Sequence, residues 1–174
     1  MLVYHPVYDV NHCLYRMLLV LEASAQEEFE WDTFKLMNFY LVFPHLLKDI
    51  KPLPAALSSY RKAINGIPNS YAEIPNPKRT LFDLSALQNM AASHLAAKSI
   101  VNLDFHRLNI IRKEQYELSS KLQTCLHSDP VREQLWFKVI TDELPLLDMR
   151  GKHGLKKRSG LMEYQYDVED KKAS

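Results

Sequence analysis

The sequence predicts a mainly α-helical fold that carries one small β-hairpin. Apolar residues recur with helical spacing along most of the chain, and this spacing changes to a short β-branched pattern around residues 100–113. The composition, 47% hydrophobic and 25% charged over 174 residues, is typical of a folded globular domain. We therefore expect a compact helical domain with a small winged-helix-like β-hairpin and a short C-terminal strand.

Helix caps and apolar stripes predict the helices of the first half. Asp9 is a favourable N-cap, and apolar residues follow it at helical spacing, so a helix is expected over 10–25. Asp32 is expected to cap a second helix, which is apolar nearly all round and therefore central in the core. This second helix should end before Pro44, and a third helix is expected over 55–65.

The second half is expected to alternate between helices and the hairpin. Three prolines make 67–78 the clearest internal loop, and a helix capped by its first residue is expected over 85–98. The hairpin follows near 100–113, and a further helix is expected over 115–126. An Asp-Pro pair, an N-cap followed by proline at the first helical position, predicts a strong continuous helix over 129–144.

The chain is expected to form a single domain in two parts. Residues 1–145 hold the helical core with its hairpin, and residues 146–174 hold a basic glycine-containing loop, a terminal strand over 161–168 and a charged tail. Three of the four glycines in the chain fall within 151–160, and they would allow the backbone there to follow a phosphate surface.

The sequence contains no recognisable catalytic or metal-binding motif. Four glycines build neither a dinucleotide fingerprint nor a phosphate-binding loop, and the seven histidines are scattered without HExxH or CxxC, although a metal site assembled from distant residues stays open. Cys13 and Cys125 lie far apart in helical patterns and are expected to be buried free thiols. Neighbouring carboxylates such as Glu27 and Glu28 are explained as helix-end charge or a solvated face.

These observations predict a protein that is not an enzyme and takes no cofactor. The N-terminus has no basic leader, and no apolar run approaches the roughly 18 uncharged residues of a membrane span. We therefore expect a cytoplasmic protein without a membrane segment.

A glycine-flanked basic segment is the first candidate binding site, although the formal net charge of +1 gives the whole chain little attraction to polyanions. The segment holds Arg150, Lys152, Lys156, Lys157 and Arg158. Five phosphate contacts would make the logarithm of the affinity fall with the logarithm of the salt concentration at a slope of about −4.5. The alternative is a solvated loop near the terminus, so nucleic-acid or partner binding and a solvated loop both stay open.

A second candidate site lies at the start of the first helix. Asp9, His12 and Arg16 share one helical face, so Asp9 could orient His12 while Arg16 reaches a carboxylate or a carbonyl of a docked partner. The simpler interpretation, an N-cap and a surface ion pair worth under about 1 kcal/mol, is favoured because nothing local requires a docking face.

Several stretches together resemble the middle component of bacterial ABC-three-component systems. The Phe-Tyr-x-x-Phe-Pro block carries most of the resemblance. The matching stretches are Tyr8-Asp9-x-x-His12-x-x-x-Arg16, residues 39–50 beginning Phe39-Tyr40-Leu41-Val42-Phe43-Pro44, Leu81-Phe82 with Leu87-Gln88, and Glu163-Tyr164-Gln165-Tyr166-Asp167.

The resemblance implies a non-catalytic accessory subunit of an SMC/Rad50-like ABC ATPase in Lamassu-type anti-phage or anti-plasmid defence. Such a subunit would lie at or near the ATPase heads and bridge them to an effector, often a nuclease. It would help to hold that effector inactive until the complex senses foreign DNA, so the expected partners are the ATPase, the effector nuclease and DNA through the complex.

Two other functional classes remain as alternatives. A winged-helix DNA-binding transcriptional regulator would need a basic face on the 85–98 helix, and that helix carries only Lys98 and His94. An unrecognised enzyme would need a titratable cluster that forms only in three dimensions.

Overall fold

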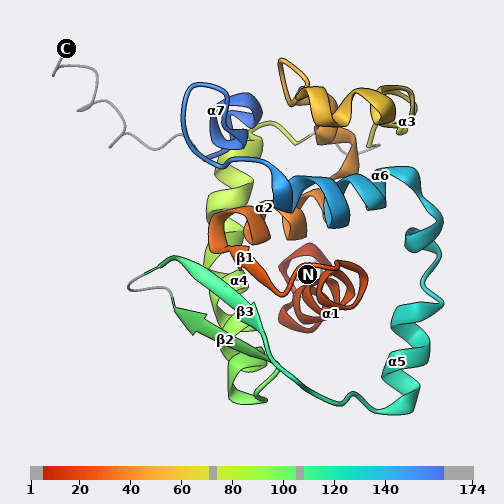
Figure 1. Cartoon of the computed structure of the whole chain (residues 1–174), viewed down its shortest axis with the longest axis vertical. Helices are drawn as coiled ribbons and strands as arrows, with labels where there is room; N and C mark the ends of the chain where they lie inside the picture. Colours follow the sequence, from red (N-terminus) through yellow and green to blue (C-terminus); the bar gives the residue numbers. More distant parts are fainter. Residues whose placement is uncertain (1–5, 71–73, 105–107, 163–174) are drawn as a thin grey trace, which may run out of the picture.

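The computed structural model describes residues 6–70, 74–104 and 108–162, and most of these residues lie in helices (Figure 1). The predicted class, mainly α with a small β-hairpin, is confirmed. The α-helices are α1 (Val10–Ala23), α2 (Trp31–Val42), α3 (Arg61–Asn65), α4 (Pro77–Ala97), α5 (Ser120–His127), α6 (Leu135–Lys138) and α7 (Leu155–Ser159). The strands are β1 (Glu28–Glu30), β2 (Val101–Asp104) and β3 (Ile110–Lys113). Short 3-10 turns are η1 (Pro6–Tyr8), η2 (Pro44–Asp49), η3 (Ala55–Tyr60), η4 (Pro130–Glu133) and η6 (Leu144–Leu146), and η5 (Val139–Glu143) is a π-turn.

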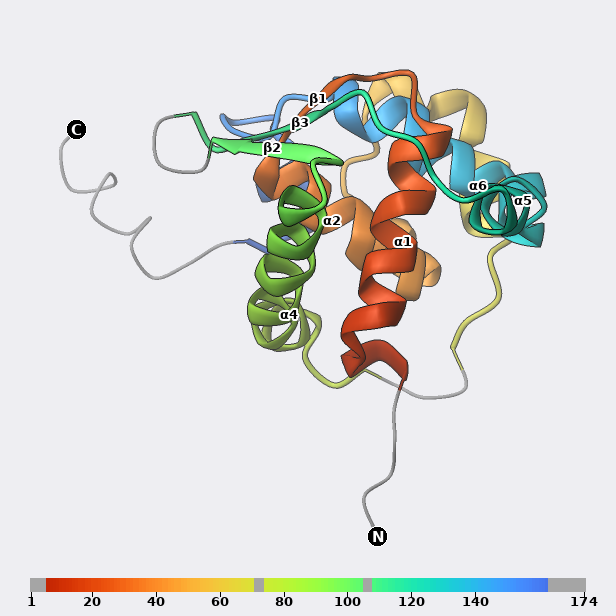
Figure 2. The same ribbon diagram turned by 90° about the horizontal axis from the view of Figure 1, so that it is seen from below.

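The core forms where α1, α2 and α4 pack together (Figure 2). As predicted, α1 begins after Asp9, whose carboxylate accepts hydrogen bonds from the backbone N–H groups of Asn11 at 2.7 Å and His12 at 3.1 Å. The predicted central position of α2 is also confirmed, because it is buried on all sides. Its side chains that are at most 1% exposed are Phe34, Leu36, Met37, Phe39 and Tyr40. Each such side chain contributes about 1.5–3 kcal/mol through burial.

Four helices begin at other residues than the sequence predicts. α3 begins at Arg61, after the 3-10 turn η3, and α5 begins at Ser120, after the Ser119 cap, instead of at residues 55 and 115. α2 and α4 also differ. Asp32 is not the cap of α2; it lies in the first turn and its carboxylate pairs with Lys35 at 2.8 Å. α4 begins at Pro77 and not at residue 85, because Asn76 caps it by accepting a hydrogen bond from the Arg79 N–H at 3.0 Å. The proline at 77 therefore marks a helix start, where its missing N–H costs nothing, and not the interior of a loop.

The hairpin pairs with a third strand that the sequence did not predict. The described sheet is antiparallel with the order β1-β3-β2, and Phe29 of β1 lies opposite Ile111 of β3 in the core. Glu28 lies in this strand and not at a helix end, and its exposed carboxylate pairs with Arg112 at 2.8 Å. Three residues of β1 are too few for a recognisable alternating pattern.

The predicted continuous helix over 129–144 is interrupted. Asp129 caps the segment as predicted, accepting a hydrogen bond from the Val131 N–H at 2.9 Å, but η4, α6, η5 and η6 follow instead of one helix. Pro145 supplies the reason at the C-terminal end, because it has no N–H for the carbonyl of Thr141, four residues earlier. The Ser24 hydroxyl donates a hydrogen bond to that carbonyl at 2.7 Å.

Replacing Ser24 with alanine is therefore expected to destabilise the fold by about 1–3 kcal/mol, because the buried Thr141 carbonyl would lose its donor. Urea unfolding followed by tryptophan fluorescence measures this change. Ser93→Ala is the matched control, since the exposed Ser93 hydroxyl bonds only within its own helix, to the Asn89 carbonyl. A loss no larger than that of the control would show that the Ser24 bond contributes nothing.

The two cysteines differ in exposure, so the prediction of two buried thiols is half wrong. Cys13 is fully buried, and burial raises the pKa of its thiol. Cys125 is a free thiol exposed on α5. The apolar stripe of α5 is short, and Leu126 is its one buried residue, which leaves Cys125 on the solvent side.

The predicted C-terminal strand is absent where the chain is described. Leu161 and Met162 are buried but lie in a bend, and the rest of the predicted strand, 163–168, lies outside the described residues.

Candidate binding surfaces

The basic segment predicted as a loop folds back on itself and ends in α7. The Leu155 N–H donates to the Asp148 carbonyl at 2.8 Å, and the Lys156 N–H donates to the Met149 carbonyl at 3.0 Å. Gly160 ends α7 in the left-handed conformation with φ 65°, a helix end that glycine adopts without strain. The segment is therefore a closed turn and not an open loop.

The five predicted cations of this segment do not all face solvent. Arg158 points inward, where its Nε donates to the His153 carbonyl at 2.6 Å and its Nη1 donates to the Pro52 carbonyl. The Lys51 N–H in turn donates to the Arg158 carbonyl at 3.0 Å. Arg158 thus holds the segment against the chain between η2 and η3.

The other four cations lie nearer to solvent. Lys152 and Lys157 are exposed, and Lys156 is half-buried. Arg150 is exposed, and its Nε lies 3.7 Å from Glu30 Oε1 in β1. Burial raises the pKa of the Glu30 carboxyl, and the nearby Arg150 charge acts in the opposite direction.

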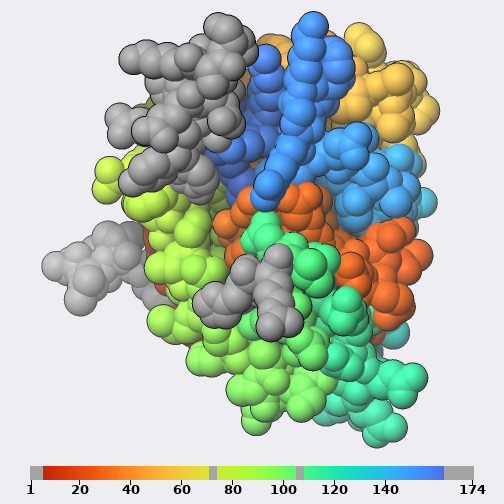
Figure 3. Space-filling view, turned by 60° about the vertical axis from the view of Figure 1, so that its left-hand side comes forward, coloured from red at the N-terminus to blue at the C-terminus, as the bar shows by residue number. Residues whose placement is uncertain are grey.

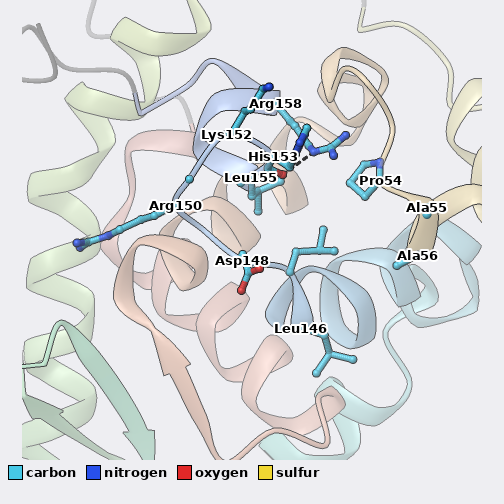
Figure 4. A pocket seen from close by; sticks show the side chains of 13 residues that line it. Pro54, Ala55, Ala56, Leu146, Asp148, Arg150, Lys152, His153, Leu155 and Arg158 are labelled. Carbon is cyan, nitrogen blue, oxygen red and sulfur yellow. Dashed lines mark hydrogen bonds between the residues drawn. The ribbon is translucent and has the colours of Figure 1, made fainter. Parts of the chain in front are cut away.

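A hollow of about 450 Å³ lies between this segment and the start of η3 (Figure 4). Arg158 and His153 stand beside Pro54, the exposed Asp148 lies apart from them, and Arg150 extends away from the others. The hollow therefore has a basic rim with one acidic side chain, Asp148, on its wall.

A second hollow, of about 180 Å³, brings in cations that the sequence analysis missed. Lys48, Lys51 and Arg61 line it, and they come from η2, the following linker and α3. No local pattern marks these residues, because they are scattered over 14 positions of a proline-rich stretch. Their proximity to the 150–158 segment arises from the packing of α7 on η2.

The Asp9, His12 and Arg16 side chains have different surroundings, although Asp9 and Arg16 interact electrostatically. Asp9 caps α1 and His12 is exposed, which supports the simpler interpretation of this group. Arg16 turns toward the interior. The pKa of its guanidinium is lowered there, because the effect of burial exceeds the opposite effect of the neighbouring Cys13. The Arg16 Nε atom is buried and has no hydrogen-bond partner among the described atoms.

One exposed helix face was not predicted as a site. Phe82 and Met90 on α4 are 58% and 51% exposed, far more than is usual for such side chains. They lie eight residues apart on the same side of α4, with the exposed Ala86 between them. The face was missed because the helix was expected to begin after Phe82.

The described residues show no arrangement typical of a metal centre. Over 6–70, 74–104 and 108–162, no three His, Cys, Asp or Glu side chains are grouped so that they could hold a metal ion. Within the same ranges, no helix combines the length and apolar character needed to cross a membrane.

Comparisons with known proteins identify the family. Neither the curated proteins nor the solved structures give a match. The family model of the ABC-three component (ABC-3C) system Middle Component 5 matches residues 2–167, which is nearly the whole chain. The chain therefore belongs to the Middle Component 5 family of ABC-three component systems, and it is a component of a multi-subunit system with protein partners.

Proposed function

We propose that the protein is a non-catalytic accessory subunit of an SMC/Rad50-like ABC ATPase complex in anti-phage or anti-plasmid defence. In this proposal it bridges the ATPase heads and an effector nuclease, and all chemistry belongs to those partners. The family match over residues 2–167 carries the proposal. The absence of a local catalytic motif in the sequence supports it.

The exposed face of α4 is the proposed docking site for the ATPase subunit. Phe82, Ala86 and Met90 give it an exposed apolar stripe, beside which the exposed Arg79 and Asp83 form an ion pair. Exposed apolar patches mark interaction sites on soluble proteins, and an apolar helix stripe fits a groove on a partner. The ATPase is the chosen occupant because the family description places the chain in an ABC system.

A winged-helix DNA-binding regulator is the second candidate. Apart from the short α3 between α2 and α4, the order α1, β1, α2, α4, β2, β3 and the sheet order β1-β3-β2 favour it, since winged helices share this arrangement. A recognition helix that reads DNA normally carries Arg or Lys for phosphates and bases, whereas the Lys and Arg of α4 are confined to its first turn, at Lys78 and Arg79, and Arg79 pairs with Asp83. The exposed Phe82 and Met90 suit a protein partner better.

Co-expression of the chain with the ATPase from the same system tests the proposal. We expect Phe82→Asp combined with Met90→Asp to weaken co-purification by tenfold or more, as for the loss of a central apolar contact. Leu135→Asp is the matched control, because Leu135 is 55% exposed but lies on α6. Failure of the unchanged chain to co-purify with the ATPase would overturn the proposed function. If the double variant still co-purified with the ATPase as well as the unchanged chain, only the α4 docking site would be overturned.

A further inference from the structure

The positive charge of the chain is concentrated in two segments that meet in the fold. Residues 48–62 and 148–158 hold nine of the 22 Lys and Arg in the chain but two of its 21 Asp and Glu. The near-neutral total therefore conceals a strongly basic end and an acidic remainder. Figure 1 shows α3 and α7 at the upper end of the molecule, away from α5.

Direct contacts join the two segments into one surface. The Lys51 N–H bonds to the Arg158 carbonyl at 3.0 Å, and Arg158 Nη1 bonds to the Pro52 carbonyl. The linker at 51–54 lines both hollows, one of which is also lined by Lys152 and the other by Arg61. In the space-filling view, the blue chain that leads to α7 stands at the upper surface beside the gold 55–65 region (Figure 3). We call the exposed cations of the two segments the basic end; those used below are Lys51, Arg61, Lys62, Lys152 and Lys157.

The basic end lacks the features of a protein interface core. Leu146 is the one large, strongly exposed apolar side chain that lines either hollow within the described chain. Protein interfaces are depleted of charge at their centre and rich in aromatic anchors, whereas interfaces with nucleic acids are polar and strongly positive. The chemistry of the basic end matches the second class.

The basic end also lacks a platform for single strands. Proteins that bind single strands stack bases on exposed aromatic rings. The strongly exposed aromatic side chains of the described residues are Tyr8 and Phe82, and neither belongs to the two basic segments. A regular array of backbone phosphates needs no such rings.

We propose that the basic end binds the phosphate backbone of duplex DNA without reading its sequence. Lys51, Arg61 and Lys62 act with Lys152 and Lys157, so the site extends beyond the basic run visible in the sequence. Arg158 serves as a positioning residue that holds the two segments together through the Pro52 carbonyl. This DNA contact is additional to docking on the ATPase and does not depend on it.

Fluorescence anisotropy of a labelled 30-base-pair duplex of arbitrary sequence tests the proposal with the full chain between 50 and 200 mM salt. Each phosphate contact adds about −0.9 to the salt slope. We expect Arg61→Gln with Lys62→Gln to reduce the slope by about 1.8, and Lys152→Gln with Lys157→Gln to reduce it equally. Lys98→Gln with Lys121→Gln is the matched control, since both lysines are exposed outside the basic end, and it should leave the slope unchanged.

Three outcomes would overturn the inference. The first is that the control substitutions, Lys98→Gln with Lys121→Gln, reduce the affinity for the duplex as much as the two pairs of substitutions in the basic end do. The second is an unchanged slope for the Arg61 and Lys62 pair, which would remove the second segment from the site. The third is absence of duplex binding together with binding of a poly-glutamate peptide, which would assign the surface to an acidic protein. Co-purification of the same variants with the ATPase reports separately on the proposed function.

Discussion

Replacing Phe34 with alanine is expected to lower the free energy of unfolding by about 3–5 kcal/mol. Phe34 is 1% exposed, and its ring centroid lies 5.2 Å from that of Phe29 and 6.1 Å from that of Trp31. It therefore joins β1 to the first turns of α2. Truncation leaves a cavity and removes two aromatic contacts, each worth about 0.5–1.5 kcal/mol beyond burial.

Urea unfolding followed by tryptophan fluorescence and by far-UV circular dichroism measures the Phe34 effect. Phe82→Ala is the matched control, because it removes the same atoms from a side chain that is 58% exposed. We expect the control to change stability by no more than about 0.5 kcal/mol. The pair also separates stability from function, since Phe82→Ala should weaken ATPase binding without unfolding the chain. Equal losses for the two variants would contradict the burial of Phe34.

Local signals were sufficient for the parts of the fold that depend on neighbouring residues. Asp9 caps α1 because the cap is a contact between residues two and three positions apart. The continuous apolar surface of α2 placed it in the core for the same local reason. Pro44 ended that helix as predicted, with η2 beginning at the proline.

The errors arise where distant contacts decide the structure. β1 is a strand only because its backbone pairs with β3, about 80 residues later. The π-turn at Thr141 is tolerated because Ser24, more than 100 residues earlier, supplies the donor that Pro145 lacks. Periodicity contains no information about either partner.

The candidate surfaces show the same division. The charge run at 150–158 was visible in the sequence, but the inward direction of Arg158 depends on the Pro52 carbonyl. Lys51 and Arg61 join that surface only through the packing of η2 against α7. The α4 face needed no distant contact, and the Asn76-Pro77 cap was the local signal that would have revealed it.

Replacing Gly154 with alanine is expected to open the turn that carries the basic segment. A Cβ atom at this position would lie 2.5 Å from the carbonyl carbon of Arg150 and 2.7 Å from the carbonyl oxygen of Met149, and neither backbone atom can move freely. The φ of −68° is ordinary for alanine, so the obstacle is the lack of space and not the backbone conformation. Two hydrogen bonds close this turn, from the Leu155 N–H to the Asp148 carbonyl and from the Lys156 N–H to the Met149 carbonyl.

Overpacking costs about 1–3 kcal/mol, and each broken backbone bond adds about 1 kcal/mol, so the expected loss of stability is about 3–5 kcal/mol. Gly66→Ala is the matched control, because its nearest contact, the Lys62 carbonyl oxygen, lies 3.2 Å away and demands a much smaller shift. Urea unfolding measures the stability of both variants, and duplex anisotropy measures their salt slopes at a temperature where both are folded. We expect Gly154→Ala to reduce the slope, since Lys152 and Lys157 leave their positions, and Gly66→Ala to retain it. A Gly154→Ala variant with unchanged stability would show that the turn accommodates a side chain and that its closure does not define the basic end.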